Sequence, residues 1–466
     1  MSVDRLSGRA RGTLLVLCGA LFLDALDVSM IGVALPSIRR DLGLSTSSLQ
    51  WVVSAYVLGY GGFLLLGGRA ADLFGRRRMF VVSLAVFIAA SALGAVASDG
   101  ALLVATRFVK GVSAAFTAPA GLSIITTSFP EGPARNKALS IYTATGATGF
   151  AFGLVFGGLL TELGWRWVFF LPVPVALLTL VGARRLLAPD SPHEAGERRF
   201  DLSGAVLLTA AMLLLVFTLV EAPSAGWASV RTVASFLAVG TIVAGFVWHE
   251  RRTPVPLVRL GILRSLSLVR ANLGAIALFG GWVGFLFIVT LYMQQLRGWS
   301  ALETGLAILP AAVVVALLAP RMGAVVSRLG VTPVIVAGLS AHLAAYALFL
   351  PIGLHSSYAL AMLPTFLLVG LGFALAYGTL NIAATNGVAP REQGLAGGIV
   401  NTAFQIGGAL VLAIVTAVDN ASRGDGGSAE ATLHGFHMAI IVSVAVVVIG
   451  IVANLVLRDG RNLPRA

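Results

Sequence analysis

The chain has 466 residues, of which 58% are hydrophobic and only 11% are charged, and its mean hydropathy is +0.93. Soluble domains carry roughly 25% charged residues, so this composition excludes a soluble globular protein and indicates a membrane protein. The net charge of +12 would suit nucleic acid, but the arginines lie in short loops between apolar segments. Retention of positive charge in cytoplasmic loops explains them better, and we expect the lipid bilayer rather than nucleic acid as the partner.

Fourteen apolar windows are long enough to cross a bilayer, because a span needs about 20 mostly apolar residues. In chain order they cover residues 12–36, 49–67, 79–97, 101–127, 138–160, 166–187, 202–221, 230–249, 270–295, 304–328, 331–350, 357–379, 394–418 and 436–457. With both termini in the cytoplasm, 24 of the 32 Lys and Arg residues lie inside, six lie outside and two lie within a span. This bias predicts an all-α, multi-pass protein of the cytoplasmic (inner) membrane with both termini in the cytoplasm.

The loop between the second and third windows combines glycines, one acid and a block of arginines. Its spacing, Gly68-x3-Asp72-x2-Gly75, recurs as Gly323-x3-Ser327-x2-Gly330 in the second half. Two duplicated bundles with a path between them are a common transporter plan. We therefore predict three parts, which are an N-terminal six-helix bundle over residues 1–187, a linker with two inserted transmembrane helices over 188–269, and a C-terminal six-helix bundle over 270–466.

The loop from Gly68 to Arg78 resembles the cytoplasmic loop motif of the major facilitator superfamily, and further motifs resemble those of its fourteen-span drug:proton antiporter branch. These motifs are Leu26-Asp27 to Pro36, Arg107-x3-Gly111, Gly149 to Gly158, Trp165 to Phe170, Leu291 to Gln295 and Asn401 to Gly408. The resemblance implies a major facilitator fold of two six-helix bundles with two extra inserted helices. It also implies a monomeric, proton-coupled exporter of amphiphilic drugs, antibiotics or related metabolites that works by alternating access.

Only two of the 20 acidic residues, Asp24 and Asp27, fall well inside a predicted span. A charged side chain at mid-membrane costs about 2.5 to 3.5 kcal/mol on insertion scales, so two acids in one helix imply charged partners or a wet cavity. At about 1.5 Å of rise per residue, Arg107 and Lys110 of the fourth window match Asp27 and Asp24 in depth. Since positions i and i+3 share a helix face, we expect Asp27 to contact Arg107 and Asp24 to contact Lys110.

These four residues form the predicted proton-coupling site. We predict that Asp27 carries the coupling proton with Arg107 tuning it, while Asp24 and Lys110 share the load or shape substrate choice. Asp24 is an acid that the family pattern does not require, and Lys110 stands where the pattern has Gln. The alternative is a purely structural set of ion pairs.

Two further groups of residues are candidates for substrate binding and for helix packing. The substrate cavity is predicted to hold Asp24, Asp27 and Lys110 together with polar residues of the second half, which could equally hydrogen-bond between helices: Gln294, Gln295, Asn381, Asn401 and Gln405. Gly149, Gly153 and Gly157 recur every four residues and are followed by Gly158. They predict a bare stripe against which another helix packs closely, either as ordinary packing or as an antiporter feature.

The loop motif is also predicted to act as a conformational latch through Gly68, Asp72, Gly75 and Arg76. Asp72 precedes the third window, where an acid complements the positive end of a helix. By the same logic it could reach the start of the thirteenth window, near Gln393 and Gly394. The resemblance implies that such a contact favours the outward-open state, while the arginines also fix the topology.

Other functions are possible for such a chain. A self-protection exporter for one host-made metabolite has the same sequence features as a drug exporter. A non-transporting sensor on the same fold is expected to lose Asp27 and the loop motif, and both are present. A polytopic membrane enzyme is not favoured, because we find no His/Asp/Cys metal cluster and no nucleophile with its base. We therefore expect no enzymatic activity, no metal and no cofactor.

Overall fold

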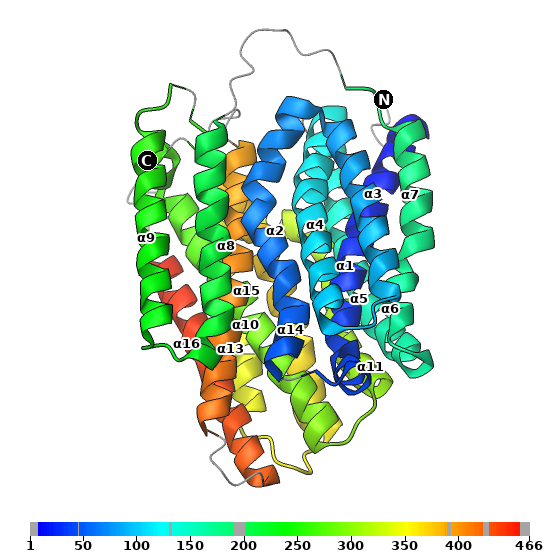
Figure 1. The fold of residues 1–466 in the computed structure, drawn as a ribbon, viewed down its shortest axis with the longest axis vertical. Helices are drawn as coiled ribbons and strands as arrows, with labels where there is room; N and C mark the ends of the chain where they lie inside the picture. The colour runs from blue at the N-terminus through cyan, green and yellow to red at the C-terminus, as the bar shows by residue number, and fades with distance from the viewer. Residues whose placement is uncertain are drawn as a thin grey trace. The chain divides into compact units, whose positions relative to one another are not determined.

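The computed structural model describes residues 8–44, 46–129, 133–190, 201–254, 256–258, 260–386, 388, 393–422 and 428–456. Every regular element over these residues is a helix (Figure 1). The first nine are α1 (Gly8–Leu42), α2 (Thr46–Phe74), α3 (Arg76–Ala95), α4 (Gly100–Ser128), α5 (Pro133–Leu163), α6 (Arg166–Phe170), α7 (Pro172–Leu186), α8 (Leu202–Ala225) and α9 (Val230–Glu250). The rest are η1 (Leu260–Arg264), α10 (Leu266–Leu291), η2 (Tyr292–Leu296), α11 (Ala301–Leu318), η3 (Ala319–Arg321), α12 (Met322–Leu329), α13 (Val331–Phe349), η4 (Tyr358–Met362), α14 (Leu363–Thr385), α15 (Gln393–Ser422) and α16 (Ala429–Val456).

Each of the fourteen predicted windows falls on one helix or on helices that follow one another directly, such as α6 with α7. Thirteen described segments are long and apolar enough to cross a membrane. The remaining window falls on α2, whose described apolar segment, Trp51–Leu64, is shorter. The predicted all-α polytopic fold is therefore confirmed.

Contacts divide the chain into two units. The first is Met1–Leu257 with Trp299–Ala316, and the second is Val258–Gly298 with Leu317–Ala466. In the first unit α8 packs against both α2 and α9. The finer division into residues 1–187, 188–269 and 270–466 stays a prediction.

Glycines bring α2 and α4 close together at the place where the charged residues lie. A Cβ atom at Gly59 or Gly67 of α2 would meet the backbone of α4, and one at Gly111 of α4 would meet the Tyr56 backbone. Bare backbone at a helix interface permits this close approach. The packing sets the face of α4 that carries Arg107 and Lys110 beside α2.

The predicted glycine stripe of α5 lies against α1. Cβ atoms at Gly149, Gly153 and Gly157 would meet the backbone of α1 at steps of one turn, namely at Phe22, Leu26 and Met30. Gly158 instead faces Leu302 at the start of α11, within the same unit. The stripe therefore has a packing role, and a special antiporter role stays a prediction.

Candidate functional site

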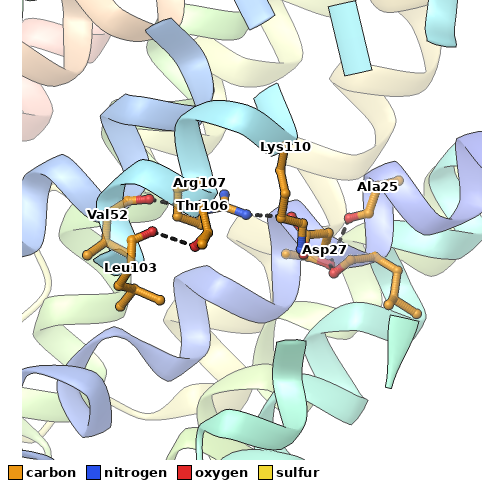
Figure 2. A network of polar contacts seen from close by, with 9 residues as sticks. Ala25, Asp27, Val52, Leu103, Thr106, Arg107 and Lys110 are labelled. Atoms are coloured by element: carbon orange, nitrogen blue, oxygen red, sulfur yellow. Dashed lines mark hydrogen bonds and ion pairs between the residues drawn. The ribbon is translucent and has the colours of Figure 1, made fainter. Parts of the chain in front are cut away.

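Asp27 lies at the centre of a buried charge cluster between α1 and α4 (Figure 2). Its side chain is fully buried, as are those of Arg107 and Lys110. The Arg107 guanidinium donates to one carboxylate oxygen of Asp27, and the Lys110 ammonium donates to the other. Because both oxygens accept a charge-assisted hydrogen bond, this is a closed, strongly bonded cluster.

The two cations are held in place by further contacts. Arg107 Nε donates to the Val52 carbonyl oxygen of α2 at 3.1 Å, and its Cζ lies 4.7 Å from the centre of the Tyr56 ring. Lys110 Nζ lies 4.7 Å from the centre of the Phe87 ring and 5.1 Å from that of Phe169. Aromatic faces attract cations through their quadrupole, so these rings partly replace the water that the buried cations lack.

Asp24 lies one helical turn before Asp27 and is only partly buried. Its carboxyl group interacts with the hydroxyl of Tyr56, and the charges of Asp27, Lys110 and Arg107 act on it from nearby. Among the described residues, the ion pairs of Arg107 and Lys110 are both with Asp27.

The expected pair of Asp27 with Arg107 is thus confirmed, and the expected pair of Asp24 with Lys110 is wrong. Matching depth did not decide the partner, because both cations lie on one face of α4 and the two oxygens of Asp27 can serve both. The site as a whole contains two acids and two bases, so it is neutral when all four are charged.

The predicted polar residues of the second half lie in the second unit. Asn401 Nδ2 of α15 reaches Asn381 Oδ1 of α14 at 3.5 Å and donates to the Gly397 carbonyl at 2.8 Å. Gln405 of α15 is buried, whereas Gln295 of η2 is exposed. Gln294 of η2 has a buried Nε2 without a described partner.

Five aromatic rings of α10, α14 and α15 form a closed series in the second unit. Each contacts the next at ring-centre distances between 4.8 and 5.9 Å: Phe279, Trp282, Phe373, Tyr377, Phe404 and back to Phe279. Asn381 Nδ2 donates to the Tyr377 carbonyl oxygen. The aromatic residues are scattered singly along the sequence, so no local motif singled them out.

The latch residues are described in part. Gly75 joins α2 to α3 with a φ of 98°, a conformation that glycine adopts without strain. Gly68 lies near Pro119 of α4, and Arg76 begins α3. The side chains of Asp72 and Gln393 are not among those that the structure describes, so the latch stays a prediction.

One residue that the sequence analysis missed, Asp190, contacts the start of α3. Asp190 accepts hydrogen bonds from the backbone amides of Arg77 and Arg78 at 2.9 and 3.1 Å. It supplies a negative charge at the N-terminal end of α3. Its only sequence signal is its place at the head of a polar segment.

Comparison with known proteins identifies the family. Residues 17–412 match the model of the Major Facilitator Superfamily. The chain belongs to this superfamily. As a Major Facilitator protein it is a multi-pass membrane transporter, and the predicted family is confirmed.

Relatives in this superfamily have names that refer to antibiotics. The chain is 38% identical to the puromycin resistance protein of Streptomyces alboniger, over 96% of this chain and 91% of that protein. It is 36% identical to the cephamycin export protein of Amycolatopsis lactamdurans, over 98% and 94%. It is 34% identical to the tetracenomycin C resistance and export protein of Streptomyces glaucescens, over 90% and 78%.

Solved structures support the fold alone. A mutant of the nucleoside transporter NupG and the human organic anion transporter TETRAN each align with a TM-score of 0.63, at 12% and 17% identity. Both alignments cover 96% of this chain and 100% of the other. At these identities the alignments support the Major Facilitator fold and say nothing of substrate.

Proposed function

We propose that this Major Facilitator transporter exports amphiphilic drugs, antibiotics or related metabolites in exchange for protons. It would do so as a monomer by alternating access, in the cytoplasmic (inner) membrane and with both termini in the cytoplasm. The observation that carries the proposal is the buried cluster of Asp27, Arg107 and Lys110 with Asp24 beside it. The resistance and export names of the relatives support the direction of transport and the substrate class.

The energetics of the site favour a functional role over a structural one. Buried ion pairs seldom gain more than their desolvation costs, and a well-packed apolar set is often as stable. Ionisable residues inside a membrane are rare for this reason and mark ion or substrate pathways. Asp24 adds a second carboxyl group without an ion pair among the described residues, which a structural cluster would not need.

The aromatic series of the second unit supports an amphiphilic substrate. Trp282, Phe373 and Tyr377 are each partly exposed, so faces or edges of these rings are available to a flat or apolar molecule. On the same helices, Asn381 follows Tyr377 by one turn and Asn401 precedes Phe404 by one turn, and their amides contact each other at 3.5 Å. Small-molecule sites commonly combine aromatic walls with a few placed polar groups.

The test is uptake of labelled puromycin into inverted vesicles that contain the protein. We expect accumulation that requires a proton gradient and stops when an ionophore collapses it. The double variant Asp24→Asn/Asp27→Asn should lose gradient-driven accumulation. Glu430→Gln, an exposed acid at the start of α16, serves as the matched control and should behave as the wild type.

Accumulation that is unaffected by the ionophore would contradict proton coupling.

A panel of compounds separates the two exporter functions. Transport of several unrelated amphiphiles fits a multidrug exporter, whereas transport of one compound alone fits a dedicated self-protection exporter.

A further inference from the structure

Resting on this proposed function, we propose that Lys110 holds Asp27 as a fixed anion and that Asp24 is the carboxyl group that exchanges the proton. This reverses the sequence-based assignment, in which Asp27 carried the coupling proton. It also gives Lys110 a positioning role that depends on its contact with Asp27.

A proton on Asp27 would disrupt every contact that this residue makes. Its two oxygens each accept from a cation, and all three side chains are buried. Neutralising Asp27 would remove the negative charge to which Arg107 and Lys110 are bonded, and a buried cation that loses its ion-pair partner is strongly unfavourable. The Val52 carbonyl and the Tyr56 ring contact Arg107 but carry no negative charge.

Asp24 has the opposite surroundings. It is less deeply buried than Asp27, and no described residue forms an ion pair with it. The groups that face it are Asp27 on its own helix, Tyr56 of α2, and Arg107 and Lys110 of α4. The Tyr56 hydroxyl can donate to the ionised carboxylate and accept from the protonated acid.

The charge of the cluster then alternates between two values. With Asp24 ionised the four residues are neutral, and with Asp24 protonated they carry one positive charge. A monovalent cationic substrate that binds at ionised Asp24 would therefore compete with the proton and give the site the same total charge, one positive, that the proton gives it. The geometry thus favours exchange of one proton for one substrate cation.

Infrared difference spectroscopy tests the assignment without a substrate. Reconstituted protein is titrated, and the carbonyl stretch of a protonated carboxyl group is followed. We expect the wild-type protein to show one titrating carboxyl band that Asp24→Asn lacks, in addition to the bands of the other acidic residues, which the two proteins share. The isosteric Asp24→Asn change breaks no described ion pair, so this variant should fold.

A second pair of variants tests the part played by Lys110. With Lys110→Gln, the residue of the family pattern, Asp27 keeps only Arg107 as its cation. The double variant Asp24→Asn/Lys110→Gln should therefore regain a titrating carboxyl band that now comes from Asp27. Identical titrating bands in Asp24→Asn and the wild type, or a double variant that gains no band over Asp24→Asn, would overturn the proposal.

Puromycin transport in the same proteoliposomes separates this inference from the proposed function. Asp24→Asn should lose gradient-driven accumulation of labelled puromycin. Normal gradient-driven accumulation in Asp24→Asn contradicts the assignment of the proton to Asp24. The wild-type protein could instead show the carboxyl band and transport puromycin independently of the proton gradient. That result would contradict proton-coupled export but would not contradict the assignment of the titrating carboxyl group to Asp24.

Discussion

Asp190 accepts a hydrogen bond from the backbone amide of Arg77, a residue 113 positions earlier in the chain. Together with the bond from Arg78, it satisfies amides that the first turn of α3 leaves without an intrahelical partner. A Cβ atom on Gly75 would collide with the Asp190 carboxylate. Two structural features therefore require glycine at position 75, which are the positive φ and the Asp190 carboxylate that occupies the space of a side chain.

Replacing Asp190 by alanine should destabilise the end of α3. Loss of a helix-capping acceptor typically costs about 1 kcal/mol. Thermal unfolding of the detergent-solubilised protein measures the effect. Asp190→Asn, which keeps one acceptor oxygen, should lose less, and Gly75→Ala should lose more because it disturbs both the cap and the backbone. Equal melting temperatures for Asp190→Ala and the wild type would show that the cap contributes nothing.

The sequence predicted some of these features and not others for identifiable physical reasons. Membrane spans are predicted from runs of apolar residues, which are a local property of the sequence, and each of the fourteen predicted windows falls on a helix. The pairing of Asp27 with Arg107 followed from depth along two helices. The partner of Lys110 could not be predicted from depth, because depth does not fix the direction in which a side chain points around the helix axis. The contact of Asp190 with α3 depends on tertiary packing across 113 residues.

Substituting Gly153 should force α1 and α5 apart. A Cβ atom there would lie 2.5 Å from the Leu26 carbonyl oxygen and would also collide with the Ser29 hydroxyl. The backbone cannot yield as a flexible side chain can, and overpacking costs roughly 1–3 kcal/mol. We expect a lower melting temperature for Gly153→Ala, measured in detergent.

Gly32 provides the matched control on α1. A Cβ atom at this position meets nothing within 4 Å, so Gly32→Ala should keep or slightly raise the melting temperature. The prediction fails if the two alanine variants unfold at the same temperature.

Glu221 connects α8 to α2. Its carboxylate accepts a hydrogen bond from Trp51 Nε1 at 2.9 Å, and Trp51 also packs on Phe217 of α8 at 5.6 Å between ring centres. Glu221→Ala should lower stability by about 1 kcal/mol through loss of this bond. Glu221→Gln keeps an acceptor for the indole and should lose less. Limited proteolysis of the loop between α8 and α9 reports whether this end of α8 has loosened, and unchanged cleavage in Glu221→Ala would argue against a stabilising contact.

Asp201, at the start of α8, contacts His249 near the end of α9, and it should make the stability of the fold depend on pH. Burial opposes its ionisation, but the Gly204 amide donates to it at 2.8 Å and His249 Nε2 lies 2.7 Å away. These contacts outweigh the burial and hold the pKa of Asp201 below its ordinary value of 3.8. A lowered folded-state pKa stabilises the fold above the unfolded pKa, and this contribution disappears as the pH falls through the lowered value.

The expected result is a stability deficit of Asp201→Asn at neutral pH that shrinks as the pH is lowered beneath 3.8. Thermal unfolding across a pH series measures it, and a double-mutant cycle with His249→Ala isolates the shared contact. Because asparagine can still accept from the Gly204 amide, the deficit reports the charge rather than the helix cap. A deficit of constant size at every pH would assign the effect to packing instead. Coupling with His249 that persists in the acid range would rule out the carboxylate as its source.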